Sequence, residues 1–192
     1  MTESIERPSA KGIEDAKQQW GQSERFRVQE ESLQFLYRKW CPNHTEPAEV
    51  LLKVTVLNAF YSTRILAKDL LAVAERIVEL NPGNRIAEGD TSLVNELAVV
   101  SVAGKNWEFY SFASKYCSQH NPDKFPIYDG YVDEMLWHFR LVDKFAKFKR
   151  KELKNYPRFV VVVHAFKEFY ELKESLRWID RYLWFNGREI FG

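Results

Sequence analysis

Several features that would assign a chain to a common class are scarce or missing here. Only two of the 192 residues are cysteines, Cys41 and Cys117, which is too few for a disulfide-stapled scaffold and favours a reduced, intracellular protein. The sequence has no run of about 18 apolar residues that could span a membrane. Residues 1–19 are polar and charged and lack the apolar core of a secretion signal. We therefore expect a cytoplasmic protein with no membrane partner.

The motifs of the common nucleotide- and metal-dependent enzymes are also absent. The sequence contains no GxxxxGKS/T or GxGxxG loop, no HExxH and no GxSxG. These absences remove the motif support for nucleotide-binding loops, for zinc proteases and for serine hydrolases. We expect no cofactor.

A net charge of +1 hides an uneven distribution. Residues 1–137 carry 15 basic and 20 acidic side chains, a net −5, whereas residues 138–158 carry eight basic and two acidic ones, a net +6. Aromatic residues interrupt this basic stretch at Phe139, Phe145, Phe148 and Tyr156. A basic patch interleaved with aromatics is typical of nucleic-acid binding. The alternative is a solvated helix face, which is what most charge runs are.

Apolar residues at helical spacing predict an all-α protein of roughly seven to nine helices. The helical segments lie near residues 26–40, 47–65, 68–80, 93–100, 107–117, 130–139, 159–170 and 176–183. Four consecutive valines at 160–163 would also fit a strand, but the helical spacing continues to Tyr170 and favours a helix. Residues 1–25 are polar and predict a flexible N-terminal extension in which one short helix near residues 13–20 is an alternative. Residues 26–192 then form a single helical domain.

The stretch from Trp107 to Val132 concentrates reactive side chains. Lys115, Cys117, His120 and Asp129 fall within fifteen residues. Asp129 comes directly before the helical run 130–139, where an aspartate is a favourable N-cap. One interpretation is therefore a simple cap. The other is a carboxylate that faces a cleft between helices, next to the basic stretch.

The cysteines and histidines leave two further alternatives open. Cys41 and His44, and Cys117 and His120, share one internal spacing, and two thiolates with two imidazoles suit tetrahedral zinc. Each pair also fits a buried cysteine beside a polar histidine, and we expect no metal. A Cys–His hydrolase would pair Cys117 with His120 or His164. No third residue or oxyanion hole supports it, and Lys115, Cys117 and His120 are interpreted as mainly structural.

Two segments resemble a known family. The sequence FPIYDGYV at residues 125–132 resembles the V-P-V-D-x-H-V segment of the helix-hairpin-helix DNA glycosylase superfamily, which includes endonuclease III and the 8-oxoguanine and adenine glycosylases. The sequence VLNAFYSTR at residues 56–64 resembles the early helix of those enzymes, which ends in a polar segment beside the extruded base. The similarity extends over roughly residues 47–140. It implies a helical fold with a cleft between two lobes.

The sequence also departs from the pattern of that family. The family hairpin, L-P-G-V-G-x-K, corresponds to Ser101–Lys105, which has one glycine and no proline. Tyr128 is an extra residue before Asp129, and Tyr131 replaces the usual histidine. Only Lys105 matches the lyase lysine by position, and Lys115 lies too near Asp129 in sequence. The resemblance therefore favours a monofunctional enzyme, and the cysteine pattern of an iron–sulfur cluster is absent.

The resemblance implies a DNA glycosylase that extrudes a modified base from double-stranded DNA and hydrolyses its N-glycosidic bond. It makes Asp129 the catalytic carboxylate, which stabilises positive charge on the sugar. The expected base-pocket residues are Asn58, Tyr61, Arg64, Trp107, Tyr128 and Tyr131, and the expected phosphate-binding residues are Gly104, Lys105, Lys147, Lys149, Arg150 and Lys151.

The substrate expected by family analogy is a modified base of phage DNA, such as glucosylated hydroxymethylcytosine, and the protein is expected to act as a monomer. One alternative is a non-catalytic helical protein that binds DNA or RNA through residues 140–158. A second is a helical regulatory protein in which Asp129 is only a cap.

Overall fold

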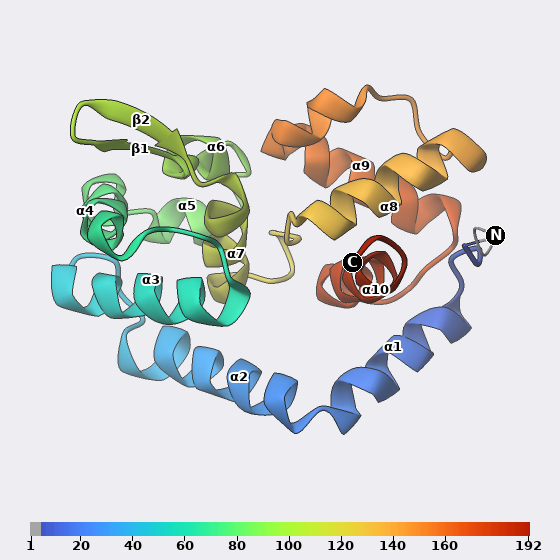
Figure 1. Ribbon diagram of the computed structural model, residues 1–192, viewed down its shortest axis with the longest axis horizontal. Coiled ribbons are helices and arrows are strands. Elements are labelled where there is room, and N and C mark those ends of the chain that lie inside the picture. The colour runs from blue at the N-terminus through green and yellow to red at the C-terminus, as the bar shows by residue number, and fades with distance from the viewer. Residues whose placement is uncertain (1–4) are drawn as a thin grey trace.

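The computed structural model describes residues 5–192 and has the expected all-α class (Figure 1). The described residues form ten α-helices, one more than the upper end of the expected range. The α-helices are α1 Ala10–Gln22, α2 Glu24–Phe35, α3 Pro47–Tyr61, α4 Leu70–Leu80, α5 Gly83–Glu88, α6 Ser92–Ala98, α7 Tyr110–His120, α8 Gly130–Val142, α9 Tyr156–Phe169 and α10 Leu176–Phe191. A π-helical turn η1 (Leu36–Trp40) and 3-10 turns η2 (Ala67–Asp69) and η3 (Arg150–Lys154) complete the helical elements.

The helices form two groups that lie side by side (Figure 1). One group contains α3 to α7, in which α3 packs on α4 and α6 packs on α7. The other contains α8, α9 and α10, in which α8 packs on α10. Helices α1 and α2 run beneath both groups, because α2 contacts α3 while α1 contacts α10. The first two helices therefore connect the two lobes.

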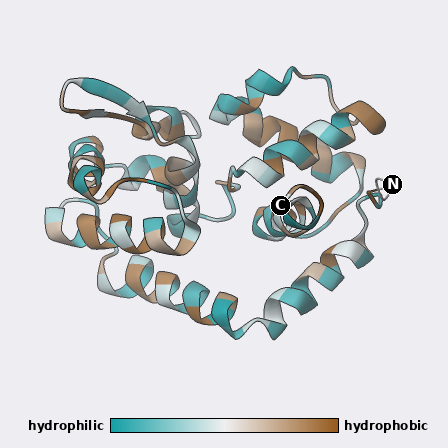
Figure 2. Ribbon diagram, viewed as in Figure 1, coloured by the Kyte–Doolittle hydropathy of each residue, from teal (hydrophilic) through white to brown (hydrophobic). Residues whose placement is uncertain are grey.

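The flexible extension expected over residues 1–25 is wrong from residue 10 onward, whereas the short helix considered near residues 13–20 lies within α1. Helix α1 begins at Ala10, where Ser9 Oγ accepts from the Gly12 amide, and Ile13 and Ala16 on it are buried. Ser23 alone separates α1 from α2 and caps α2 through the Phe26 amide. Both helices are largely polar with isolated apolar turns (Figure 2). The buried positions of α1 pack against α10, more than 150 residues away in sequence, so neighbouring residues alone do not show what covers them. Residues 1–4 lie outside the described residues.

The valine-rich segment is helical, as expected. Asn155 caps α9 by accepting from the Arg158 amide, and Pro157 occupies the first turn, where a missing amide hydrogen costs nothing. Val160, Val162 and Val163 are buried on α9. Tertiary packing around the segment thus outweighs the strand preference of valine.

A two-stranded β-hairpin replaces the helical hairpin expected at residues 101–105. Strands β1 (Val99–Val102) and β2 (Lys105–Glu108) pair antiparallel, with Val102 opposite Lys105. The two turn residues, Ala103 and Gly104, have φ angles of 48° and 76°, as two-residue hairpin turns require. Three β-branched residues in β1 favour this strand. The helix expected over 93–100 therefore ends earlier, at Ala98, the helix expected over 107–117 begins and ends three residues later, and the hairpin joins α6 to α7.

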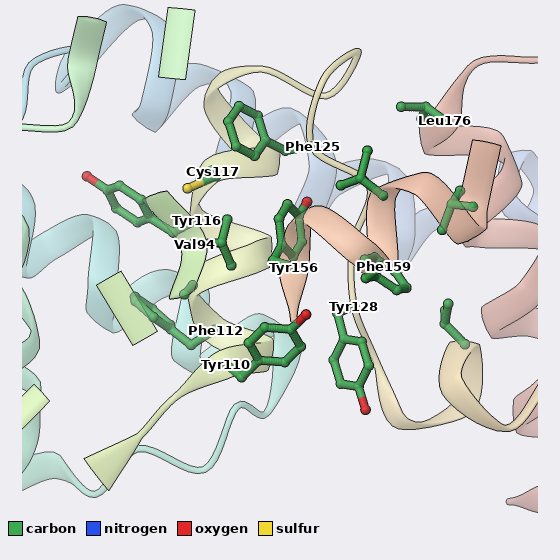
Figure 3. Packing of buried hydrophobic residues seen from close by; sticks show 14 of the residues in the cluster. Val94, Tyr110, Phe112, Tyr116, Cys117, Phe125, Tyr128, Tyr156, Phe159 and Leu176 are labelled. Atoms are coloured by element: carbon green, nitrogen blue, oxygen red, sulfur yellow. The ribbon is translucent and has the colours of Figure 1, made fainter. Parts of the chain in front are cut away.

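Aromatic packing fixes the loop that precedes Asp129. Tyr110 and Phe112 on α7, Phe125 and Tyr128 in the loop, and Tyr156 on α9 share one core (Figure 3). Tyr156 donates a hydrogen bond to the Pro126 carbonyl at 2.6 Å. The loop between α7 and α8 is thus held from two helices, and the start of α8 has a defined position.

Candidate active site

A cavity of about 950 Å³ lies between the lobes. It is enclosed by α1 and α2, by the end of α3, by α7, by the first turn of α8 and by α10. Cavities that bind small molecules commonly have volumes up to about 1,000 Å³. Lys115 and Asp129 both line it, and five arginines from α2, α10 and the end of α3 also contribute.

Asp129 has the two roles that the sequence left as alternatives. Its Oδ1 accepts from the Tyr131 amide at 3.1 Å and so caps α8, while its Oδ2 lies 3.1 Å from Lys115 Nζ. The side chain keeps 22% of its surface exposed, on the cavity side. A capping aspartate at a helix N-terminus is stabilised by the amide dipoles of the first turn. The carboxylate is therefore positioned rigidly and still reaches a ligand.

Lys115 is the main residue whose position the sequence interpretation missed. Its Nζ donates to Ser111 Oγ at 2.6 Å, to the Tyr128 carbonyl at 3.2 Å and to Asp129 Oδ2 at 3.1 Å. Burial lowers the pKa of this amine, and the charge of Asp129 opposes the shift. Asp129 follows Lys115 by fourteen positions, and the chain between them includes a loop that folds back along α7. Because this loop folds back, Lys115 and Asp129 are in contact. Their short separation in sequence, which had counted against Lys115 as the partner of Asp129, does not keep them apart.

Two serines of α7 hold the chain just before Asp129. Ser114 Oγ accepts from the Tyr128 amide at 3.1 Å, and Ser111 Oγ donates to the Tyr128 carbonyl at 3.2 Å. Both polar groups of Tyr128's backbone are thus tied to α7. The geometry between Lys115 and Asp129 consequently depends on side chains one turn away.

Three of the expected base-pocket residues line the cavity, namely Tyr61, Arg64 and Tyr131. The Tyr61 hydroxyl accepts from Gln119 Nε2 at 3.0 Å, and burial raises its pKa. The Tyr61 ring centroid lies 5.6 Å from Lys115 Nζ. Arg64 and the neighbouring Ser62 have φ angles of 63° and 49°. Left-handed non-glycine residues are strained and often occur at functional sites.

The other three expected base-pocket residues lie outside the cavity lining, which corrects the prediction. The Asn58 amide is used within its own loop, where it donates to the Ile65 carbonyl and accepts from the Ile65 amide. The Tyr128 hydroxyl donates to Asp133 Oδ2 at 3.0 Å, and its ring packs in the core. Trp107 is on β2 and 51% exposed. Asn58 and Tyr128 thus use their polar groups in local hydrogen bonds, and Trp107 lies on the hairpin, outside the cavity.

Helix α10 contributes a charged face that the sequence interpretation did not assign to the site. Arg177, Asp180 and Arg181 have the spacing of one helix face, are at most 9% exposed, and line the cavity. Arg181 Nη2 lies 2.6 Å from Glu30 Oε2 of α2. The sequence did contain a signal for this face, namely three charged residues in the otherwise apolar run of residues 176–185. Charged residues in such a run indicate a paired or functional site, because charges are rarely buried otherwise.

The expected phosphate-binding residues divide into two surfaces. Lys147, Lys149 and Lys151 are exposed on the segment around η3, and Lys105 is exposed on the hairpin with Gly104. Arg150 is different, because its guanidinium is engaged by Asp133 at 2.6 Å and by Glu134. Its charge is already compensated by these two partners, which leave it less available to phosphates than the lysines.

The cysteines and histidines form no metal site in the described part of the chain. Among residues 5–192, no three His, Cys, Asp or Glu side chains are grouped to hold a metal ion. Cys41 and Cys117 are buried free thiols, and burial raises the pKa of Cys117. His44 Nδ1 lies 2.9 Å from the Tyr116 hydroxyl, and burial lowers the pKa of His44 to about 4. These groups are part of the core, which corrects both the zinc and the Cys–His hydrolase alternatives.

Comparison with known proteins places the chain in a family. A family model described as HI_0787_N, N-terminal domain, matches residues 12–124. The chain belongs to this family. An uncharacterized protein of Haemophilus influenzae is 47% identical over 143 residues, which cover 74% of this chain and 68% of that relative. No solved structure matches the chain.

The HI_0787_N match begins in α1 and ends in the loop before Asp129. It includes Lys115 and the α2 and α3 walls of the cavity. Asp129 and the charged face of α10 lie beyond it. The structure also shows no helix among residues 5–192 long and apolar enough to cross a membrane.

Proposed function

We propose that this HI_0787_N family member is a DNA glycosylase that removes a modified base from double-stranded DNA. The observation that carries the proposal is the contact of 3.1 Å between Lys115 Nζ and Asp129 Oδ2 on the wall of the cavity. An amine with a lowered pKa beside a carboxylate can attack an electrophilic carbon while the carboxylate stabilises positive charge. The sugar C1′ of a nucleotide is such a carbon when its base departs.

The cavity supports the binding step of this proposal. An extruded base needs a pocket with stacking surfaces and polar groups at its edges. Tyr61 and Tyr131 supply aromatic surfaces, and Arg64 supplies a donor. The volume of about 950 Å³ leaves room for a base with a substituent. Glucosylated hydroxymethylcytosine, proposed by family analogy, is one base of this kind.

The chemistry proceeds at the carbon that carries the base. As the N-glycosidic bond breaks, its electron pair leaves with the base, and the sugar gains oxocarbenium character. Ionised Asp129 stabilises that charge. Lys115 Nζ, once neutral, forms a bond to C1′. The C1′–O4′ bond then breaks, its electron pair and one proton of the amine pass to O4′, and a protonated imine with the opened sugar remains. The contact between the two side chains therefore favours an enzyme with lyase activity, in place of the monofunctional enzyme that the resemblance alone favoured.

DNA binding is assigned to the exposed lysines. Lys147, Lys149 and Lys151 are free to contact phosphates, and Lys105 with Gly104 presents a second point of contact on the hairpin. Such contacts make affinity fall steeply with salt. The protein is proposed to act in the cytoplasm as a monomer. The same exposed lysines also favour a second candidate, a non-catalytic nucleic-acid-binding protein.

Incubation with modified DNA separates the two candidates. The protein is mixed with duplex oligonucleotides that contain 8-oxoguanine, 5-hydroxymethylcytosine or its glucosylated form, and with phage genomic DNA, and abasic sites are assayed. The glycosylase proposal expects abasic product from at least one DNA, and its loss in Asp129→Asn with DNA binding retained. Salt-sensitive binding without abasic product on any of these DNAs contradicts the proposal and supports the second candidate.

A further inference from the structure

A second carboxyl group lies in the same cavity as Lys115 and Asp129. Asp180 is on α10, is 4% exposed, and lines the cavity together with the other two residues. The charges of both Asp129 and Asp180 act on the Lys115 amine. Asp180 lies outside residues 47–140, to which the resemblance extends, and outside the family match. The mechanism described above gives it no role.

The segment of chain that precedes α8 anchors the side chain of Asp180 by a hydrogen bond. Its Oδ2 accepts from the Ile127 amide at 3.0 Å, and Ile127 also lines the cavity two residues before Asp129. The other oxygen, Oδ1, accepts no hydrogen bond from the described residues. It is also absent from the fully buried atoms that lack a partner, so part of its surface stays accessible. One oxygen thus anchors the carboxyl group, and the other can reach a ligand.

Enclosure in the cavity wall favours a proton on Asp180. Burial raises its pKa to about 6, while the charge of Arg177, the hydrogen bond from the Ile127 amide and the charge of Arg181 oppose the shift. Glu30 of α2 raises the pKa further. The charge of Asp180 in turn acts on Lys115 of α7, Tyr61 of α3 and Tyr156 of α9. Asp129, at the start of α8, acts on the same Lys115 amine.

Asp129 and Asp180 therefore occupy opposite environments within one cavity. Asp129 is partly exposed, sits at a helix N-terminus and contacts the Lys115 amine. Asp180 is enclosed and has no salt bridge within 4 Å in the described residues. Two carboxyl groups whose surroundings separate their protonation states are the usual arrangement for one acid and one charged stabiliser.

We propose that Asp180 is the general acid that protonates the departing base. The assignment rests on the proposed glycosylase function. The N-glycosidic bond breaks and its electron pair passes to the base, while the proton of Asp180 moves to a nitrogen or oxygen of that base. Lys115 Nζ forms the new bond to C1′. Asp180 is left as a carboxylate, which takes a proton from solvent once the base has left.

The substitution Asp180→Asn tests this assignment. Asparagine has the same shape and can still accept from the Ile127 amide, but it cannot donate a proton as an acid. Loss of a general acid costs on the order of 10²-fold or more in rate. We expect base release from the modified duplex to fall by about that factor. Borohydride reduces the imine between Lys115 and an abasic sugar to a stable cross-link. Formation of this cross-link with a preformed abasic duplex should remain in Asp180→Asn, because no base leaves in that reaction.

Asp69→Asn is the matched control, because Asp69 is also 4% exposed but does not line the cavity. It should release base at the wild-type rate. Equal base release by Asp180→Asn and wild type overturns the assignment of Asp180, and so does an equal loss of base release and of cross-linking. Absence of abasic product from every DNA tested with the wild type overturns instead the proposed function.

The pH dependence of base release, compared between the wild type and Asp180→Asn, gives a second test. A general acid must be protonated, so its contribution is lost as pH rises. The wild-type rate of base release should decline on the alkaline side between about pH 6 and pH 9. In Asp180→Asn, that decline should be missing. A wild-type rate without an alkaline decline, or the same decline in the variant, overturns the assignment.

Discussion

Lys115 Nζ and Asp129 Oδ2 lie 3.1 Å apart, one on the inward face of α7 and the other at the first turn of α8. The contact joins the two lobes at the wall of their common cavity. Lys115 also donates to Ser111 Oγ and to the Tyr128 carbonyl, so three acceptors fix its amine. A buried lysine held in this way has a defined reactive atom, and that property underlies the first prediction.

Lys115→Gln should abolish the covalent cross-link that borohydride forms between the protein and an abasic duplex. Glutamine lacks the amine that makes the imine. The measurement is the shifted band in a denaturing gel. Lys105→Gln is the control, because the exposed hairpin lysine lies outside the cavity. A cross-link that persists in Lys115→Gln and disappears in Lys105→Gln would reverse the assignment and restore the lysine favoured by the resemblance.

The three exposed lysines around η3 should determine the salt dependence of DNA binding. Replacing Lys147, Lys149 and Lys151 by glutamine should lower the slope of log affinity against log salt by roughly 2 to 3, since each phosphate contact contributes about one unit. Arg150→Gln should change the slope less, because Asp133 and Glu134 already compensate the charge of Arg150. Fluorescence anisotropy with a labelled duplex at several salt concentrations measures both. An unchanged slope in the triple variant contradicts the assignment of this surface.

A substitution at Gly104 in the hairpin turn should lower the stability of the protein through backbone strain alone. Gly104 has a φ of 76°, and no atom lies within 4 Å of the place that a Cβ would take, so Gly104→Ala meets no steric clash. We expect a loss of about 1 kcal/mol in the free energy of unfolding from the left-handed conformation. Gly21→Ala is the opposite case, since Gly21 lies in α1 with equal space, and alanine in a helix should stabilise by about 0.5–1 kcal/mol. Urea denaturation gives both values, and the same sign for both substitutions would contradict the argument.

Stability should fall on mild acidification because of the buried histidines. Burial lowers the pKa of His44 to about 4 and that of His120 to about 2. Below the ordinary value near 6.5, the unfolded chain binds protons that the folded chain does not, so the free energy of unfolding falls as pH falls. His44→Gln removes one of these protons. Its stability should therefore decline less steeply between about pH 6.5 and pH 4, by up to about 1.4 kcal/mol per pH unit, and parallel curves would contradict the shift.

Helix periodicity and capping signals in the sequence predicted much of the fold. The helices expected near residues 47–65, 68–80 and 130–139 correspond to α3, α4 and α8 of the structure, and Asp129 caps α8, which was one of its two expected roles. The hairpin at 99–108 was missed because two short strands with a two-residue turn resemble the end of one helix and the start of the next. The pairing of β1 with β2 and the turn angles of Ala103 and Gly104 distinguish the two.

The sequence by itself determined the helical class, the position of Asp129 directly before a helix and the basic segment around η3, because each depends on neighbours within a few turns. Only the tertiary structure decided that Lys115 contacts Asp129, that α1 and α2 close one side of the cavity, and that Asp180 enters it from α10. These relationships join segments that lie far apart or fold back on themselves. Their geometry is set by packing across the whole chain, and no local pattern of residues encodes it.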